Sequence, residues 1–208
     1  MLVQDIMTHK VVAIDPEMPI SDVNTLMEQR GIRHFPIVEA STLVGIVSDR
    51  DIRIVGSEHP KAPKGISMKH PVRQIMKSPV FTAHPLDPVE EAAKVLHLHK
   101  IGAMPVLDGE SLVGIVTAID FLEAMTRMTN VYDATSRLEI AVDNCPGALA
   151  TALESIASKN INVSSVMTTR SDPDTVCFVL RVGTLDVHHL ADNLRNEGFE
   201  VLWPFESL

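Results

Sequence analysis

The sequence predicts an α+β protein with two pseudo-symmetric β-α-β-β-α units, followed by a smaller βαββαβ domain. The first observation is an internal repeat. Residues 43–51 and 112–120 share the run Leu-Val-Gly-Ile-Val, and each then has a hydroxyl residue and, three positions later, an aspartate. The second is the length of 208 residues, which leaves about 80 residues after the repeat for another domain. Two copies predict a pseudo-symmetric pair, because a solenoid normally needs at least three repeats.

The composition is typical of a soluble globular protein, with 45% hydrophobic and 22% charged residues. No apolar run approaches the roughly 20 residues that cross a bilayer, and no signal peptide is evident at the N-terminus. We therefore expect a cytoplasmic protein with no membrane contact. The two cysteines, Cys145 and Cys177, are too few for a disulfide framework or a cysteine zinc site, so we expect reduced thiols.

The charge distribution limits the possible partners. A net charge of −9 argues against sequence-independent binding of nucleic acid, which requires a concentrated positive surface. The first repeat nevertheless carries a cluster of arginines, namely Arg30, Arg33, Arg50 and Arg53. An anionic ligand would meet its cations there, although a solvated surface of mixed charge explains the cluster equally well.

Each copy begins with a short β-prone run, residues 11–14 and 80–82, followed by a proline and a helical pattern. In the second copy Asp87 is predicted to cap the helix, with Pro88 at the first helical position. The predicted core faces recur at matching positions: Ile20, Val23 and Met27 in copy one, and Val89, Ala92 and Leu96 in copy two.

A hairpin and a second helix complete each copy. The hairpins pair residues 35–38 with 43–47, and 104–107 with 112–116. Ser48 and Thr117 then begin helices, with Asp51 and Asp120 three residues on, as in a capping box. Residues 57–70, which are rich in Gly, Pro and Lys, are interpreted as the linker between the copies.

The repeated hydroxyl-x-x-aspartate pattern has two explanations. One is capping alone. The other is a ligand site, because a carboxylate at a helix start can accept ribose hydroxyls while free N–H groups and a guanidinium bind phosphate. No nucleophile–base pair and no glycine-rich loop with a lysine is evident, which favours binding of a nucleoside phosphate over catalysis. The histidines lack metal-ligand spacing, so we expect neither a metal nor a cofactor.

These motifs resemble a tandem pair of CBS domains, the Bateman module, over residues 1–126. The resemblance is carried by Asp-Ile-Met-Thr at 5–8, His-Phe-Pro-Ile-Val at 34–38 and Gly-Ile-Val-Ser-Asp-Arg-Asp at 45–51. The two repeats would span about residues 1–56 and 71–126. The resemblance implies that an adenosine compound binds between them, with Ser48, Asp51, Thr117 and Asp120 on ribose, and with Arg33, His34, Phe35, Pro36, Ala103, Met104 and Pro105 near adenine.

The same resemblance suggests that the two sites are unequal. Arg50 is the expected phosphate contact, and its counterpart in the second repeat is Ile119. One well-formed phosphate site is therefore favoured over two.

After a linker at 127–135, the pattern changes to strands and helices in the order βαββαβ, the ferredoxin-like split unit. This order, with Asp-Asn-Cys-Pro-Gly-Ala-Leu at 143–149, resembles an ACT domain over residues 136–208. The resemblance implies pairing of subunits into a homodimer and an amino-acid site at five positions: Asn144, Gly147, Ala148, Leu149 and Asn162. A turn in a domain used only for dimerisation explains the motif equally well.

A CBS pair followed by an ACT domain resembles the acetoin-utilisation, AcuB-type family. The resemblance implies a non-catalytic regulatory sensor that binds AMP, ADP or ATP, acts in carbon or energy metabolism and controls an unidentified protein. Four alternatives stay open: a structural dimeriser without ligands, a regulator that binds S-adenosylmethionine, a relative of an enzyme carrying a CBS insert, and a DNA-binding regulator, against which the acidic charge balance speaks.

Overall fold

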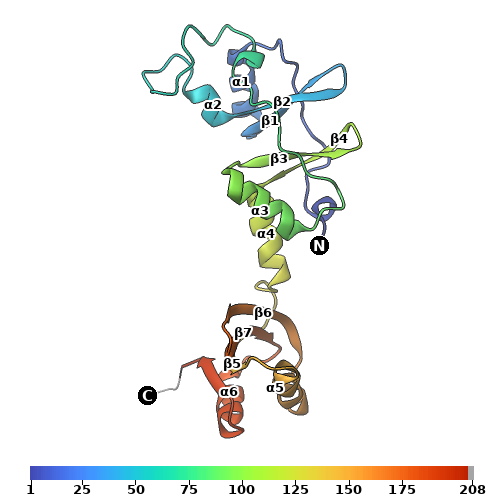
Figure 1. Cartoon of the computed structure of the whole chain (residues 1–208), viewed down its shortest axis with the longest axis vertical. Coiled ribbons are helices and arrows are strands. Elements are labelled where there is room, and N and C mark those ends of the chain that lie inside the picture. The colour runs from blue at the N-terminus through green and yellow to red at the C-terminus, as the bar shows by residue number, and fades with distance from the viewer. Residues whose placement is uncertain (206–208) are drawn as a thin grey trace. The chain divides into compact units, whose positions relative to one another are not determined.

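The structure, a computed structural model, describes residues 1–205 and contains two compact units, Met1–Leu122 and Glu123–Leu208. Figure 1 labels most of the helices and strands of each unit. The fold class is confirmed, because two β-α-β-β-α units are followed by a ferredoxin-like domain. Within the described residues, no helix combines the length and apolar character needed to span a membrane.

The two repeats of the first unit contain matching elements. In repeat one they are α1 (Ile20–Arg30), β1 (His34–Glu39), β2 (Thr42–Ser48) and α2 (Asp49–Arg53); in repeat two they are α3 (Val89–His99), β3 (Ala103–Asp108), β4 (Ser111–Thr117) and α4 (Ala118–Met128). The β1–β2 and β3–β4 hairpins are antiparallel and have the same register. Pro36 lies opposite Ile46, and Pro105 lies opposite Ile115. The internal repeat is therefore structural as well as sequential.

The first strand of each repeat is shorter than the sequence predicts. In place of strands over 11–14 and 80–82, the structure has single parallel bridges, Ile14 to Ile37 and Ala83 to Val106. A proline follows each bridge two residues later, at Pro16 and Pro85, and proline cannot donate to a β-ladder. The order of elements is as expected, but the pairing stops after one bridge.

The predicted cap at Asp87 is wrong. Its carboxylate accepts the N–H of His84 at 2.7 Å, and α3 begins at Val89 with Pro88 as its N-cap and no side-chain cap. The N–H of Val89 instead donates to the carbonyl of Met1 at 3.2 Å. The first N–H group of α3 therefore finds its acceptor in a backbone carbonyl far away in the sequence.

The first N–H group of α1 also bonds to a distant segment: the Ile20 N–H donates to the carbonyl of His70, just before repeat two, at 2.9 Å. The short 3₁₀ helices η1 (Val3–Asp5) and η2 (Val72–Gln74) lie in these two crossing segments. Figure 1 shows the N-terminus beside α3 rather than beside α1. Each repeat is thus completed by the segment that precedes the other repeat.

Backbone pairing and burial also show that the two repeats exchange their N-terminal segments. Thr8 exchanges two hydrogen bonds with Ile115 of β4, at 2.9 and 3.1 Å, and Lys77 does the same with Ile46 of β2, at 2.8 and 3.1 Å. Val72 of the second crossing segment is fully buried in the apolar core of repeat one. Residues 1–8 therefore belong structurally to repeat two, and residues 70–77 to repeat one.

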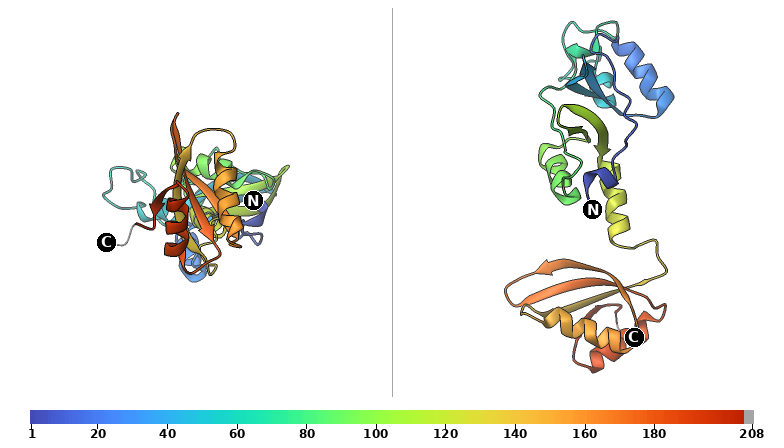
Figure 2. Two further views of the ribbon diagram at one scale, coloured as in Figure 1. Left: turned by 90° about the horizontal axis from the view of Figure 1, so that it is seen from below. Right: turned by 90° about the vertical axis from the view of Figure 1, so that its right-hand side faces the viewer.

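The second unit is a four-stranded antiparallel sheet with two helices. Its elements are β5 (Ser136–Asp143), α5 (Ala148–Ser158), β6 (Val163–Ser171), β7 (Thr175–Val182), α6 (Val187–Asn196) and β8 (Glu200–Trp203). The strand order is β6-β7-β5-β8, and Figure 2 shows both helices on one face of the sheet. Leu138, Ile140 and Leu180 are fully buried between the sheet and the helices.

Two glycines permit the crossing segments to approach the hairpins. A Cβ placed on Gly45 would lie 2.4 Å from Met76 Sδ and 3.1 Å from Met76 Cβ, and one on Gly114 would lie 2.4 Å from Met7 Sδ. We expect Gly45→Ala to weaken the pairing of Ile46 with Lys77, because such overpacking costs about 1–3 kcal/mol. Hydrogen exchange should report about tenfold or greater loss of protection at these two amides.

Gly183→Ala is the matched control, because its new Cβ would meet no atom closer than 3.5 Å. Met76→Ala in the Gly45→Ala background should restore most of the protection by removing the clash. Unchanged protection in Gly45→Ala alone would contradict the steric requirement.

Candidate functional site

The Ser48–Asp51 pair forms a complete capping box at the start of α2. Asp51 Oδ2 accepts the Ser48 N–H at 3.0 Å and its hydroxyl at 2.6 Å, and Ser48 Oγ accepts the Asp51 N–H at 3.4 Å. One carboxylate oxygen, Oδ1, takes no part in the box. Capping therefore fixes the carboxylate in place through Oδ2 alone.

The second repeat places Thr117 and Asp120 in the same way. Asp120 Oδ2 accepts the Thr117 N–H at 2.7 Å and its hydroxyl at 2.8 Å. Within residues 1–205, Asp120 Oδ1 makes no recorded hydrogen bond or ion pair. Both repeats thus present a fixed aspartate with one oxygen outside the capping bonds, and such an oxygen can accept ribose hydroxyls.

Lys77 is a site residue that the sequence analysis missed. Its ammonium lies 3.3 Å from Asp51 Oδ1, although in the sequence the two residues belong to different repeats. The lysine reaches Asp51 because Lys77 pairs with Ile46, two residues before Ser48. Its position in the sequence, at the start of repeat two, gives no signal of this contact.

Further charged groups surround the start of β1. The Asp49 N–H donates to the Arg33 carbonyl at 2.9 Å, which holds the start of α2 beside the residue that precedes β1. His34 is half-buried, and burial lowers the pKa of its imidazole from the ordinary 6.5. The carboxylates of Asp49 and Asp51 oppose this pKa shift, whereas the guanidinium groups of Arg33 and Arg50 add to it. His34 is therefore the centre of a cluster of opposed charges.

His34 also contacts the second repeat. A Cβ placed on Gly102 would lie 2.9 Å from His34 Nε2, so the imidazole packs directly against this backbone. Gly102 precedes β3, and its carbonyl accepts the Ala118 N–H at 3.0 Å, close to Asp120. The two sets of candidate residues therefore meet at the contact between His34 and Gly102.

The other predicted residues differ in what they can offer to a ligand. Arg33 and Arg50 are exposed and available to an anion. Five predicted residues around the two central prolines are buried as whole residues; they are Phe35, Pro36, Ala103, Met104 and Pro105. The helix α2 has only five residues, so any phosphate there would depend on side-chain cations more than on the helix dipole.

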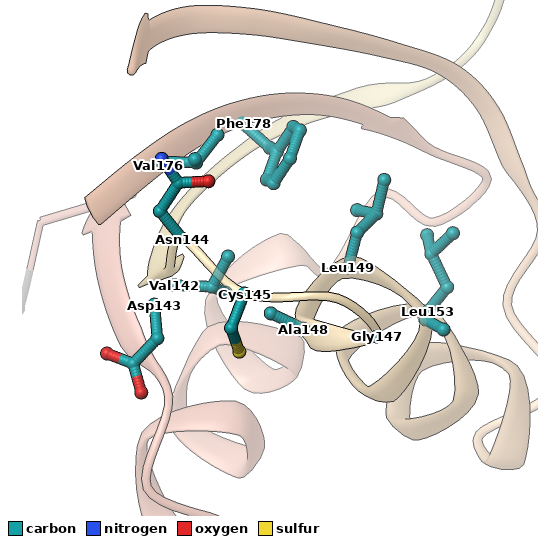
Figure 3. Close-up of a pocket in the computed structure, with 11 residues that line it drawn as sticks. Val142, Asp143, Asn144, Cys145, Gly147, Ala148, Leu149, Leu153, Val176 and Phe178 are labelled. Carbon is teal, nitrogen blue, oxygen red and sulfur yellow. The ribbon is translucent and has the colours of Figure 1, made fainter. Parts of the chain in front are cut away.

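A pocket of about 330 Å³ lies at the turn between β5 and α5 (Figure 3). Its lining includes Asn144, Gly147, Ala148 and Leu149, together with apolar side chains of which Phe178 is the largest. The Asn144 amide donates to the Asp172 carbonyl at 2.7 Å, which ties this turn to the β6–β7 turn. The residues predicted at the turn are thus brought together around one hollow.

The structure separates the role of Gly147 in the turn from the position of Asn162. Gly147 has φ of +93°, a conformation that favours glycine, so its conformation suffices to explain the glycine. Asn162 does not line the pocket, because α5 carries the chain over 11 residues away from the turn first. Its carbonyl accepts the Gly183 N–H at 2.8 Å instead.

Comparison with known proteins agrees with this architecture. The CBS domain profile matches residues 3–58 and 72–127, and a TTHA0829-like ACT domain profile matches residues 135–203. The chain therefore belongs to the CBS domain family and carries an ACT domain at its C-terminal end.

Three relatives illustrate the similarity. CBS domain-containing protein YhcV of Bacillus subtilis is 29% identical over 142 residues, which cover 68% of this chain and 96% of that protein. A solved structure described as acetoin utilization protein AcuB of Vibrio cholerae is 31% identical, with a TM-score of 0.55, over 64% of this chain and 95% of that one. This likeness agrees with the AcuB-type architecture.

The third relative was solved with ligands. The CBS domain pair of protein MJ0100 is 28% identical, with a TM-score of 0.54, over 61% of this chain and 97% of that one. Its structure contains 5′-methylthioadenosine and S-adenosyl-L-methionine.

The cluster around His34 predicts a pH response. The His34 C2–H signal should titrate below pH 6.5 by NMR, and Asp49→Asn should lower this pKa further, because it removes the carboxylate that most opposes the shift. The unfolded chain takes up this proton at a higher pH than the folded chain. The protonation of His34 therefore favours unfolding as the pH falls from 6.5 through the folded pKa.

Asp22→Asn is the control, because Asp22 lies in the first turn of α1 and is not among the groups that act on His34. A His34 pKa at or above 6.5, or one that Asp49→Asn leaves in place, would contradict this description of the site.

Proposed function

We propose that the protein is a regulatory sensor that binds an adenine nucleotide between its two CBS repeats and has no catalytic activity of its own. The observation that carries the proposal is the twofold placement of a fixed carboxylate, Asp51 and Asp120, directly after equivalent strands. Each carboxylate is held by its own capping hydroxyl and keeps one oxygen outside these bonds, and that oxygen of Asp51 pairs with Lys77. The chain would use these oxygens to hold ribose.

The comparison with MJ0100 supports an adenosine compound as the ligand, since that CBS pair was solved with two such compounds. The same comparison keeps S-adenosylmethionine as the second candidate. The cations Arg33, Arg50 and Lys77 around Asp51 favour a phosphorylated ligand there, because guanidinium and ammonium groups form strong charge-assisted hydrogen bonds with phosphate.

Titration calorimetry tests the ribose role. On protein stripped of ligand, AMP, ADP, ATP and S-adenosylmethionine are titrated in turn into wild type and Asp51→Asn. We expect the substitution to weaken nucleotide binding about tenfold or more, because a hydrogen bond to a charged group contributes about 1.5–3 kcal/mol. The amide keeps the shape of the side chain, so the fold should survive.

Asp22→Asn, on the outer surface of α1, is the matched control and should bind as wild type does. Equal affinity of Asp51→Asn and wild type would remove the ribose role. Absence of heat with all four compounds would contradict the sensor and favour a scaffold without ligands.

We also propose that the pocket between β5 and α5 binds an amino acid and that the ACT domain pairs two chains into a homodimer. At the pocket end of α5 the Ala148 N–H donates to the Cys145 carbonyl at 3.3 Å, whereas the N–H groups of Leu149 and Ala150 come before the first intrahelical bond, from Thr151 to Gly147, and can receive a carboxylate. The mostly apolar lining suits an uncharged side chain. Two edge strands, β6 and β8, leave backbone groups available for pairing.

Filling the pocket tests the amino-acid proposal. Ala148→Phe should abolish any thermal shift that single amino acids produce in wild type, whereas Ala157→Phe, on an exposed face of α5 outside the pocket, should keep it. No shift with any amino acid in wild type would assign the domain to dimerisation alone. Sedimentation of the same samples should give a dimer, and a monomer would overturn the pairing.

The AcuB-type architecture supports a role in carbon or energy metabolism, of the acetoin-utilisation kind, in the cytoplasm. In this role, nucleotide binding would favour one arrangement of the repeats, and a regulated protein would read that arrangement. A ligand shifts such an equilibrium only by its difference in affinity for the two states.

A further inference from the structure

We propose that the two CBS sites take chemically different ligands. The site at Asp51 takes an adenosine compound with a charged phosphate at its 5′ position, and the site at Asp120 takes one whose 5′ group is uncharged. This inference rests on the proposed function and adds which ligand class each site accepts. The protein would then respond to a phosphorylated adenosine and a phosphate-free adenosine at the same time.

The site at Asp51 contains three cations beside the carboxylates of Asp49 and Asp51. Lys77 Nζ lies 3.3 Å from Asp51 Oδ1, and both Arg33 and Arg50 are close enough to His34 to lower its pKa. Three positive groups from three separate segments thus lie around His34 and Asp51. They outnumber the two carboxylates, Asp49 and Asp51, that also act on His34 and that would repel a bound phosphate.

The site at Asp120 has the same backbone without those charges. The offset of 69 residues relates Arg33, Arg50 and Lys77 to Gly102, Ile119 and Thr8. The backbone contacts are conserved in geometry: Ala118 donates to Gly102 at 3.0 Å as Asp49 donates to Arg33 at 2.9 Å, and Thr8 pairs with β4 as Lys77 pairs with β2.

The chemistry of the 5′ end therefore differs between the sites. At Asp120 the carboxylate has no cation corresponding to Lys77, so a phosphate would face an uncompensated negative charge. Ile119, whose surface is 57% exposed, would offer an apolar contact where Arg50 offers a guanidinium. An adenosine with an uncharged, apolar 5′ group, such as a thioether, matches this surface.

The two sites are in direct contact through His34 and Gly102. His34 belongs to the site at Asp51, and the Gly102 carbonyl receives the N–H that begins the helix carrying Asp120. A ligand that moves the imidazole also presses on the backbone of the other site. This contact gives the two ligands a physical route by which each affects the affinity of the other.

Exchanging the counterpart residues tests the assignment. Titration calorimetry is run with AMP and with 5′-methylthioadenosine on stripped full-length wild type, Arg50→Ile and Ile119→Arg. We expect one AMP per chain in wild type, with one methylthioadenosine still binding when AMP is saturating. Arg50→Ile should weaken AMP about tenfold or more, and Ile119→Arg should create a second AMP site.

Lys94→Gln is the charge-matched control, because this exposed lysine of α3 pairs with Glu91 and lies outside both sites. It should leave AMP binding unchanged. Two equal AMP sites in wild type, or no effect of either exchange, would overturn the inference while keeping the proposed function. Failure of both compounds to bind wild type would overturn the proposed function, and this inference with it.

Discussion

The exchange of N-terminal segments between the two repeats is the interaction on which the first unit depends. Thr8 pairs with Ile115 and Lys77 pairs with Ile46, so neither repeat completes its own hairpin surface or the N-terminus of its first long helix. The exchanged segments can approach the hairpins closely only because each hairpin has a glycine, Gly45 or Gly114, where a methionine Sδ packs. This dependence explains why the glycine of the Leu-Val-Gly-Ile-Val run occurs in both copies: it accommodates a partner from the opposite repeat.

The same exchange builds the candidate nucleotide site. It brings Lys77 from the start of repeat two to Asp51 at the end of repeat one, and it leaves Thr8 at the equivalent place in the other site. Because the backbone is pseudo-symmetric, a few sequence differences between the copies give two related sites different chemistry. Where the backbone is the same, the side chains alone determine which ligand each site can accept.

The ACT unit shows a different principle, because its pocket is built mainly from one continuous turn. Gly147 adopts positive φ, α5 begins directly after it, and the Asn144 amide fastens the turn to Asp172. The pocket therefore follows from local backbone geometry supported by one contact across the sheet. This locality is the reason that the sequence already groups the turn residues, whereas Asn162, beyond the far end of the helix, does not line the pocket.

The sequence by itself determined the repeat, the hairpins, the βαββαβ order and the capping box of Ser48 and Asp51. These features depend on periodicity and on residues within a few positions of one another. It did not determine the single-bridge first strands, the uncapped start of α3, the contact of Lys77 with Asp51, or that of His34 with Gly102. Each of these features depends on a partner more than 20 residues away in the chain. Only the tertiary structure brings such partners together, because the crossing of the two segments decides which residues become neighbours.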